Sequence, residues 1–263
     1  MEVTQTCLGA EVTFRICPRL ETKGPNVIKG INLEGLRVVG EVSELAQQYY
    51  EQGADELIVT DVTSSWFSRE STVTLLTNLL GNCFIPITVG GGIRTLSDAD
   101  SCLRAGAERV SINSAAFTSP ELFPKIADKY GCQATVLNIQ AKRVGGNFMC
   151  YFENGREPSG LSLQQLVEQS FLTSVGEIFL NSVDFDGTRR GIDLALIEQI
   201  LNLTDKPIMY CGGVSSEHDI ITLIDFGFNA VSISSALHYK SLNLSALKQT
   251  LQMSQIDVRP LSL

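Results

Sequence analysis

Two stretches of the sequence, 121 residues apart, match each other and decide the fold. Gly91–Ala116 reads GGIRTLSDADSCLRAGAERVSINSAA, and Gly212–Leu237 reads GGVSSEHDIITLIDFGFNAVSISSAL. Nine of the 26 aligned pairs are identical, among them the two leading glycines and a Ser-Ala pair near the end. Two units that had only converged on similar packing would match at apolar positions, but not at the glycines and the serine together. We therefore expect an internal duplication of half-barrels.

The alternation of a short apolar run with an amphipathic segment extends along the whole chain. Apolar runs predict eight strands: Thr13–Leu20, Glu56–Thr60, Ile85–Val89, Arg109–Ile112, Ala134–Ile139, Glu177–Leu180, Pro207–Tyr210 and Ala230–Ile233. The segments between and after them predict eight helices: Val42–Gln52, Glu70–Leu80, Ser97–Arg104, Glu121–Lys129, Leu163–Phe171, Leu194–Leu201, Glu217–Asp225 and Asn243–Gln252. The strands are apolar nearly throughout, as buried parallel strands are. Eight such units in 263 residues predict one closed (β/α)8 TIM barrel of the α/β class.

One stretch departs from this alternation. Lys142–Ser159 contains an Asn-Gly turn between aromatic-rich flanks, which predicts a β-hairpin on the barrel rim. No linker or low-complexity segment divides the chain. We expect residues 13–263 to form a single barrel and residues 1–12 to be an N-terminal extension.

Composition excludes several classes of protein. Apolar residues make up 44% of the chain and charged residues 19%, enough for a large core. The formal net charge of −9 argues against a nucleic-acid partner, although backbone amides can still bind a phosphate locally. No apolar run is long enough for a membrane span, and the start MEVTQTCLGAEV lacks the features of a secretory signal. The seven scattered cysteines include no CxxC pair, which indicates reduced thiols and a cytoplasmic protein.

The repeated motifs predict two phosphate sites. Glycines directly after a barrel strand let a ligand approach the backbone, and the next helix N-terminus offers unpaired amides. One site in each half, at the carboxyl-terminal mouth, predicts a long ligand with a phosphate at each end. The predicted phosphate-binding residues are Gly91, Gly92, Asn113, Ser114, Gly187, Thr188, Gly212, Gly213, Ser234 and Ser235.

Few side chains are candidates for acid–base chemistry. Carboxylates at strand ends are Glu21, Asp61 and Asp186, and Asp186 lies in an Asp-Phe-Asp-Gly-Thr loop that could orient a substrate hydroxyl. Gln140 ends the fifth strand, opposite Glu21. We expect His218 and His238 to be structural or exposed, and we expect no nucleophilic role for Cys211, which has no histidine nearby. No cluster has metal-ligand spacing, so we predict neither a metal nor a cofactor.

Four charged residues fall near the other ends of the strands. Arg15, Glu56, Arg109 and Glu177 each stand near the first residue of a predicted strand. Buried charges are costly unless paired, so side chains pointing inward would form a charge-balanced ring across the barrel floor. Such a ring suits a gate for a small polar molecule.

Several runs resemble one known family over nearly the whole chain. They are ADELIVTDVTSS (54–65), TVGGGI (88–93), GAERVSINSAA (106–116), AKRVGGNFM (141–149) and GEIFLNSVDFDGT (176–188), together with the Gly212-Gly213 and Ser234-Ser235 pairs. The chain is similar to the cyclase subunit of imidazole glycerol phosphate synthase, a barrel of the ribulose-phosphate-binding type and a lyase of histidine biosynthesis.

The resemblance implies a glutamine amidotransferase. A glutaminase partner would dock on the floor as a heterodimer, and its ammonia would pass the gate, where Arg15, Glu56 and Glu177 match the family and Arg109 replaces a usual lysine. At the mouth, ammonia would attack a phosphoribulosyl-formimino bis-phosphate. The products would be imidazole glycerol phosphate and aminoimidazole carboxamide ribonucleotide.

The chain departs from the family where the family carries an aspartate general acid and an aspartate general base. Glu21 and Gln140 occupy those places, and glutamine cannot exchange a proton at neutral pH. Two interpretations therefore remain open. The first is an ammonia-using cyclase that works slowly, or in which Asp186 or Glu21 replaces the missing acid. The second is a catalytically altered relative that conducts ammonia to a different amidating enzyme, for instance in surface-sugar synthesis.

Overall fold

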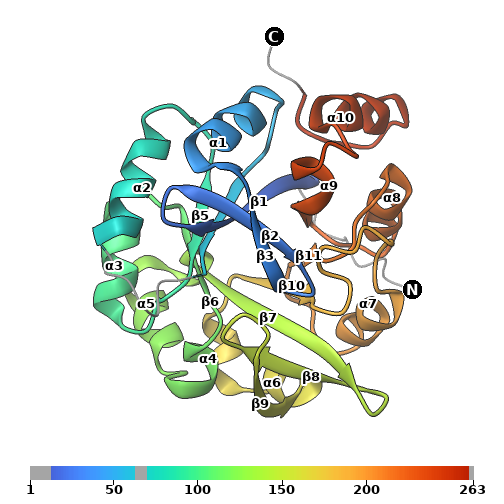
Figure 1. Cartoon of the computed structure of the whole chain (residues 1–263). Coiled ribbons are helices and arrows are strands. Elements are labelled where there is room, and N and C mark those ends of the chain that lie inside the picture. Colours follow the sequence, from blue (N-terminus) through green and yellow to red (C-terminus); the bar gives the residue numbers. More distant parts are fainter. Residues whose placement is uncertain (1–12, 63–69, 261–263) are drawn as a thin grey trace, which may run out of the picture.

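The computed structural model describes residues 13–62 and 70–260, and the predicted N-terminal extension, residues 1–12, lies outside the described residues. Eight parallel strands form the central sheet (Figure 1). They are β1 (Arg15–Lys23), β4 (Leu57–Asp61), β5 (Ile87–Gly90), β6 (Arg109–Ile112), β7 (Thr135–Val144), β10 (Glu177–Ser182), β11 (Ile208–Cys211) and β12 (Ala230–Ile233). All eight strand positions predicted from the sequence are confirmed to within a few residues.

Pairing of the first strand with the last closes the sheet. β1 pairs with β12 through Ile16 and Val231, and with β4 through Leu20 and Val59. β7 and β10, which flank the inserted strands, pair directly. Each central strand therefore has a parallel neighbour on both sides, and the predicted closed barrel is confirmed. We call the carboxyl ends of these strands the mouth and their amino ends the floor.

Helices surround the barrel, as Figure 1 shows. The helices are α1 (Val42–Glu51), α2 (Glu70–Leu80), α3 (Leu96–Arg104), α4 (Ala115–Thr118), α5 (Leu122–Tyr130), α6 (Leu163–Val167), α7 (Leu194–Leu201), α8 (Glu217–Asp225), α9 (Ser235–His238) and α10 (Leu244–Met253). The predicted helix Leu163–Phe171 is shorter than expected, because an extended residue, Gln169, separates α6 from a 3-10 turn over Ser170–Ser174. Another 3-10 turn covers Cys132–Ala134. No helix of the described residues is both long and apolar enough to cross a membrane.

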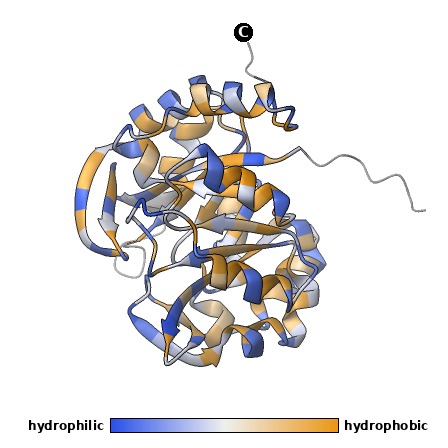
Figure 2. Ribbon diagram, turned by 90° about the vertical axis from the view of Figure 1, so that its right-hand side faces the viewer, coloured by the Kyte–Doolittle hydropathy of each residue, from blue (hydrophilic) through white to orange (hydrophobic). Residues whose placement is uncertain are grey.

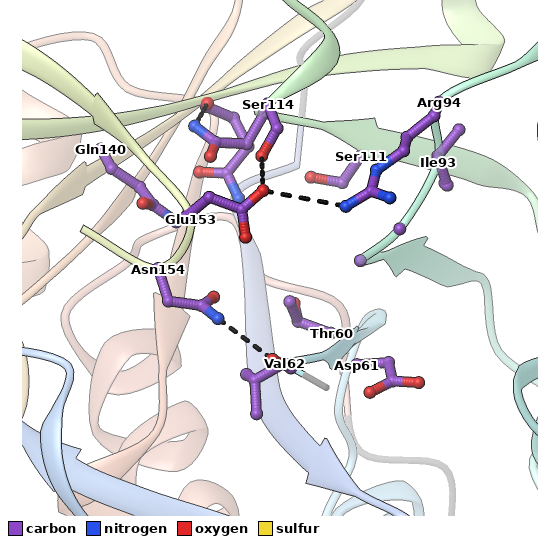
Figure 3. Close-up of a pocket in the computed structure, with 14 residues that line it drawn as sticks. Thr60, Asp61, Val62, Ile93, Arg94, Ser111, Ser114, Gln140, Glu153 and Asn154 are labelled. Carbon is purple, nitrogen blue, oxygen red and sulfur yellow. Dashed lines mark hydrogen bonds and ion pairs between the residues drawn. The ribbon is translucent and has the colours of Figure 1, made fainter. Parts of the chain in front are cut away.

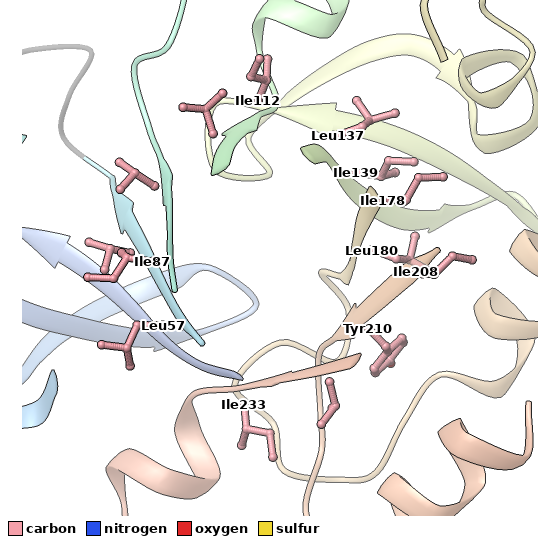
Figure 4. Close-up of a cluster of buried hydrophobic side chains, with 14 of the residues drawn as sticks. Leu57, Ile87, Ile112, Leu137, Ile139, Ile178, Leu180, Ile208, Tyr210 and Ile233 are labelled. Atoms are coloured by element: carbon pink, nitrogen blue, oxygen red, sulfur yellow. The ribbon is translucent and has the colours of Figure 1, made fainter. Parts of the chain in front are cut away.

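Alternation along the strands divides the apolar side chains into two groups. Residues such as Leu57, Ile178 and Tyr210 point outward and pack under the helices in one large core (Figure 4). A second, smaller cluster of buried residues, including Ile58, Phe179 and Met209, comes from the alternate positions and fills the barrel interior. In Figure 2 the helices carry both hydrophobic and hydrophilic residues, as helices with one face on a sheet do.

Two antiparallel insertions stand on the mouth. β8 (Asn147–Phe152) and β9 (Glu157–Ser162) meet at the Asn154-Gly155 turn, so the predicted hairpin is confirmed. It continues β7, which pairs with β8. The other insertion, β2 (Asn26–Ile31) with β3 (Glu34–Glu41), was not predicted. β1 runs three residues beyond the predicted end at Leu20 and turns back on itself, pairing Thr22 with Val27.

The two halves share backbone detail as well as sequence. Asp98 accepts hydrogen bonds from the amides of residues 94 and 95, and Asp219, 121 residues later, accepts them from those of residues 215 and 216. Both aspartates complete a capping box at the start of a helix, with Thr95 and Ser216. The same cap at matched positions supports duplication of a half-barrel.

Gly91 cannot be replaced without disturbing this backbone. Its φ is +98°, and a Cβ would lie 2.1 Å from the carbonyl oxygen of Asp61. Gly227 has a similar φ of +83°, but nothing lies within 4 Å of the corresponding Cβ position. We predict that Gly91→Ala lowers the free energy of unfolding by about 3 kcal/mol or more, and Gly227→Ala by about 1–2 kcal/mol from backbone strain alone. Chemical denaturation measures both, and equal losses would contradict the role of the close contact.

Candidate functional site

A pocket at the mouth lies against the first Gly-Gly pair (Figure 3). It is open to solvent and is lined by Gly91, Gly92, Asn113, Ser114 and Gln140, among others. The β8–β9 turn contributes Glu153 and Asn154 to its wall. Figure 3 shows Glu153 between Ser114 and Arg94, at 3.4 Å from the Ser114 hydroxyl and 3.9 Å from the guanidinium.

Some hydrogen-bond donors of this pocket already bind other groups of the protein. The side-chain amide of Asn113 donates to the carbonyl oxygens of Asn138 and Tyr151, at 2.9 and 3.2 Å, and so connects the end of β6 to β7 and β8. Arg94 is about half exposed, so its cation can turn toward an anion in the pocket. An entering phosphate would compete with Glu153 for both Arg94 and Ser114.

A second, smaller pocket lies against the second Gly-Gly pair. Its lining includes Gly187, Arg189, Gly212, Gly213, Ser234 and Ser235. The hydroxyl of Ser235 is buried and has no hydrogen-bonding partner among the described residues, which leaves it available to a ligand. Thr188 is not part of this lining; its hydroxyl donates to the carbonyl oxygen of Phe185 at 2.8 Å.

The two pockets lie on opposite sides of the mouth. Gly91 follows β5 and Gly212 follows β11, and these strands are four apart in the closed sheet of eight. The arrangement matches the expectation of one anion pocket per half, facing a shared opening. Phosphate binding by these residues remains a prediction.

Four buried charged side chains meet between the pockets, and we call them the mouth cluster: Arg19, Glu21, Lys29 and Asp186. The ammonium of Lys29 lies 2.5 Å from one carboxylate oxygen of Glu21 and 2.5 Å from one of Asp186. Arg19 lies 3.1 Å from Glu21 and 3.4 Å from Asp186. Two cations thus bridge two carboxylates, and the cluster is neutral as a whole.

The protonation states of this cluster follow from its pairing. Burial alone would raise the pKa of the Glu21 carboxyl, but Arg19 and Lys29 outweigh burial and hold that pKa below its ordinary value. For Lys29, burial is likewise outweighed, because Asp186 and Glu21 raise the pKa of the ammonium. Glu21 is therefore a carboxylate and a poor proton donor at neutral pH, while it can still act as a base or stabilise positive charge.

Gln140, the other predicted catalytic residue, lies on the opposite side of the barrel from Glu21. It faces Glu21 from β7, four strands away from β1, and its side-chain oxygen accepts a hydrogen bond of 2.7 Å from the amide of Gly155. Glu21 and Gln140 lie inside their strands rather than after them, because β1 and β7 both extend into hairpins. Asp186 is joined to Glu21 through Lys29, whereas Gln140 is not part of the mouth cluster.

At the floor, the structure brings all four predicted gate residues together. Arg15 bridges Glu56, at 2.6 Å, and Glu177, and Arg109 bridges the same two carboxylates. Thr88 completes this floor ring: its hydroxyl donates to Glu56 at 2.5 Å and accepts from Arg109 at 3.2 Å. The arrangement closes the amino end of the barrel with paired charge.

Sequence reasoning missed Lys29 and Thr88. Lys29 lies on β2, which the sequence did not reveal, and a lysine in a short apolar run is normally an exposed side chain. Its burial results from a hairpin that folds back over the mouth. Thr88 lies one position after Ile87, so strand alternation could have placed it on the inward face with Glu56. The described residues include no group of three or more His, Cys, Asp or Glu side chains that could hold a metal ion.

His238 supports the mouth cluster from outside. Its Nε2 donates to the carbonyl oxygen of Arg19 at 3.1 Å, so its Nδ1 accepts a 2.7 Å hydrogen bond from the hydroxyl of Tyr49. In the neutral imidazole both ring nitrogens are satisfied by these two bonds. Burial, with a smaller contribution from Lys29, lowers the pKa of His238 to about 4. The expected structural role of this histidine fits both bonds.

Comparison with known proteins gives one family model and several relatives that share a name. The model of the family described as "Histidine biosynthesis protein" matches residues 15–243. A protein of Legionella pneumophila named imidazole glycerol phosphate synthase subunit HisF is 45% identical over 76% of this chain and 95% of its own. Proteins of the same name from Thermobifida fusca and Helicobacter hepaticus are 39% and 37% identical, over 94% and 93% of this chain and 99% and 98% of their own.

We predict that His238 makes the stability of the protein depend on pH. Between pH 6.5 and 4 the unfolded chain binds a proton at this histidine and the folded chain does not, so the free energy of unfolding falls as the pH falls. The slope reaches about 1.4 kcal/mol per pH unit, or about 3 kcal/mol over the interval. Denaturant titrations at several pH values should show a shallower slope for His238→Gln than for the wild type. His218→Gln, on the exposed face of α8, is the matched control, and an unchanged slope in His238→Gln would contradict the prediction.

Proposed function

The chain belongs to the histidine biosynthesis protein family, and from this premise we propose that it is the cyclase subunit of an imidazole glycerol phosphate synthase. It takes ammonia from a glutaminase partner and joins it to a phosphoribulosyl-formimino bis-phosphate. The products are imidazole glycerol phosphate and aminoimidazole carboxamide ribonucleotide. The shared name of the relatives favours this function over conduction of ammonia to a different amidating enzyme.

The observation that carries this proposal is the pair of pockets on opposite sides of one mouth. Each pocket is built on a Gly-Gly corner, and each adds an arginine and a serine to its wall: Arg94 and Ser114 in the first, Arg189 and Ser235 in the second. A substrate with a phosphate at each end would have its central, reacting part over the mouth cluster. Binding energy from the two ends would then orient the centre.

The mouth cluster limits the chemistry at that centre. Gln140 transfers no proton, and Glu21, held as a carboxylate, suits a base better than an acid. Lys29, whose pKa is raised, is a fixed positive charge between Glu21 and Asp186 rather than a proton donor. We infer that substrate positioning and charge stabilisation supply most of the rate, and that this cyclase is slow for lack of a matched acid–base pair.

The floor ring supports a route for ammonia through the barrel. Its four charges are fully paired, so it presents no net charge to a neutral molecule at the amino end of the barrel. A glutaminase docked against the floor would release ammonia directly at Arg15 and Arg109, which are partly accessible, while Glu56 and Glu177 are buried behind them.

We predict that the purified protein turns over the bis-phosphate substrate with ammonium salt, and that Gln140→Asp raises kcat by about 10- to 100-fold. The reason is that a carboxylate at this position restores a group able to exchange protons. Steady-state assays of product formation measure the effect. Gln133→Asp, the same change at an exposed position, should leave kcat as it is.

Two results of this assay would contradict the proposal. Absence of turnover in the wild type and in Gln140→Asp would mean that the chain is not a cyclase. An equal rise of kcat in Gln133→Asp would mean that the added charge acts at a distance rather than through proton transfer.

A further prediction concerns the floor ring. Arg109→Ala removes one of the two bridges between Glu56 and Glu177 and leaves both carboxylates with Arg15 alone. In the complex with the glutaminase, we expect the glutamine-driven rate to fall at least tenfold further than the ammonium-driven rate, because external ammonia can enter at the mouth. Loss of both rates by the same factor would show that the ring has no role in passage.

A further inference from the structure

The barrel interior has an apolar layer above the floor ring. Its side chains are Cys17, Ile58, Val136, Phe179, Met209 and Ala230, all buried and gathered in one cluster. Strand residues alternate between the two faces of the sheet, so two steps along a strand return to the inward face. At the next inward-facing positions along these strands, the side chains are polar. We call this second set the polar layer: Arg19, Asn138, Asn181 and Ser232, together with the thiol of Cys211.

The polar layer is unusual because several of its buried hydrogen-bonding atoms have no partner among the described residues. The Nε of Arg19, the side-chain oxygen of Asn138, both side-chain amide atoms of Asn181 and the hydroxyl of Ser232 have no partner among the described residues. All four side chains are at least 95% buried. Unpaired buried polar atoms are costly, and native proteins keep few of them without a reason.

These atoms lie around one side of the interior rather than being scattered. Asn181 is in register with Cys211 across β10 and β11, and Cys211 with Ser232 across β11 and β12. Arg19 reaches this group from β1: its Nη1 is 3.7 Å from the Cys211 sulfur, and its guanidinium carbon lies 5.3 Å from the centre of the Phe179 ring. The polar layer therefore sits directly on the apolar layer.

The polar layer also connects the two pockets. Asn138 lines the pocket of the first half, and Cys211 and Ser232 line that of the second. Asn181 lies between them on β10. A molecule held in the polar layer would be under the centre of a ligand that spans both pockets.

The chemistry of the unpaired atoms selects a small neutral molecule with both donors and acceptors. Arg19 Nε and Asn181 Nδ2 offer hydrogens, the oxygens of Asn138 and Asn181 accept them, and Ser232 can do either. A cation is disfavoured because Arg19 is already charged and the mouth cluster is balanced without another positive group.

We propose that Arg19, Asn138, Asn181 and Ser232 form a holding site for neutral ammonia at the inner end of the apolar layer. The lone pair of ammonia accepts from Arg19 Nε, and its hydrogens reach the oxygens of Asn138 and Asn181. This inference rests on the proposed function. The holding site adds to that function a place where neutral ammonia binds beneath the bis-phosphate substrate before it reacts.

The test compares Asn181→Leu with the wild type in ammonium-driven turnover. The leucine has the same branched shape but removes a donor and an acceptor, and we expect the KM for ammonia to rise about tenfold. The kcat at saturating ammonia and the KM for the bis-phosphate should stay within about twofold. Ser232→Ala, a smaller change that guards against misfolding of Asn181→Leu, should raise the KM for ammonia about threefold. Asn202→Leu, on the exposed end of α7, is the matched control.

Two kinetic results would overturn the holding site while the cyclase stands. One is a KM for ammonia that is unchanged in Asn181→Leu and Ser232→Ala, including the case in which the KM for the bis-phosphate rises instead. The other is a wild-type KM that stays constant with pH when expressed as ammonium ion rather than as free ammonia, since the site as proposed excludes the cation.

A binding measurement tests the holding site without turnover, so failure of the holding site can be distinguished from failure of the proposed function. At about pH 9, ammonium chloride should raise the Tm of the wild type and of Asn202→Leu above that in the same concentration of potassium chloride. Asn181→Leu should show no such difference. Equal Tm values in the two salts for the wild type would overturn the site, whatever the outcome of the cyclase assay.

Discussion

The pairing of β1 with β12 is the constraint on which the rest of the molecule depends, because it closes the sheet. Closure leaves no free edge among the central strands and brings all of their carboxyl ends to one mouth. The corners at Gly91 and Gly212, far apart in the chain, therefore face one another. It also gives every strand an outer face for the helices and an inner face for the barrel interior, so that strand alternation assigns each side chain to a core or to the interior.

Charge in the interior is confined to its two ends and is paired at both. The floor ring joins two arginines to two glutamates, and the mouth cluster joins an arginine and a lysine to two carboxylates. Charges buried without partners would destabilise the barrel by several kcal/mol each. Between the two charged groups lies the apolar layer, which a neutral molecule crosses at lower cost than an ion.

Each hairpin lies beside one of the two pockets, and this makes the duplicated halves different. The β8–β9 turn brings Glu153 and Asn154 to the first pocket, where Asn154 donates to the carbonyl oxygen of Val62 at 3.2 Å. The turn after β2 lies against the second, where the amide of Asn32 donates to the carbonyl oxygen of Asp186 at 2.7 Å. The half-barrels share the Gly-Gly corners, and the β8–β9 turn adds side chains to the wall of the first pocket only.

Local pattern was enough to determine the barrel, its duplication and the place of most site residues. Apolar runs, amphipathic periodicity and repeated glycines are short-range features, and β-then-α order leaves few ways to arrange them. The pairing of the gate charges followed from strand position for the same reason. Only the tertiary structure decided that Lys29 is buried between Glu21 and Asp186 and that Gln140 is bound to Gly155. It also decided that the polar side-chain atoms of Asn181 and Ser232 have no partner among the described residues. The first two facts depend on the path of a hairpin and the third on hydrogen bonding inside the barrel, and the spacing of residues along the chain determines neither.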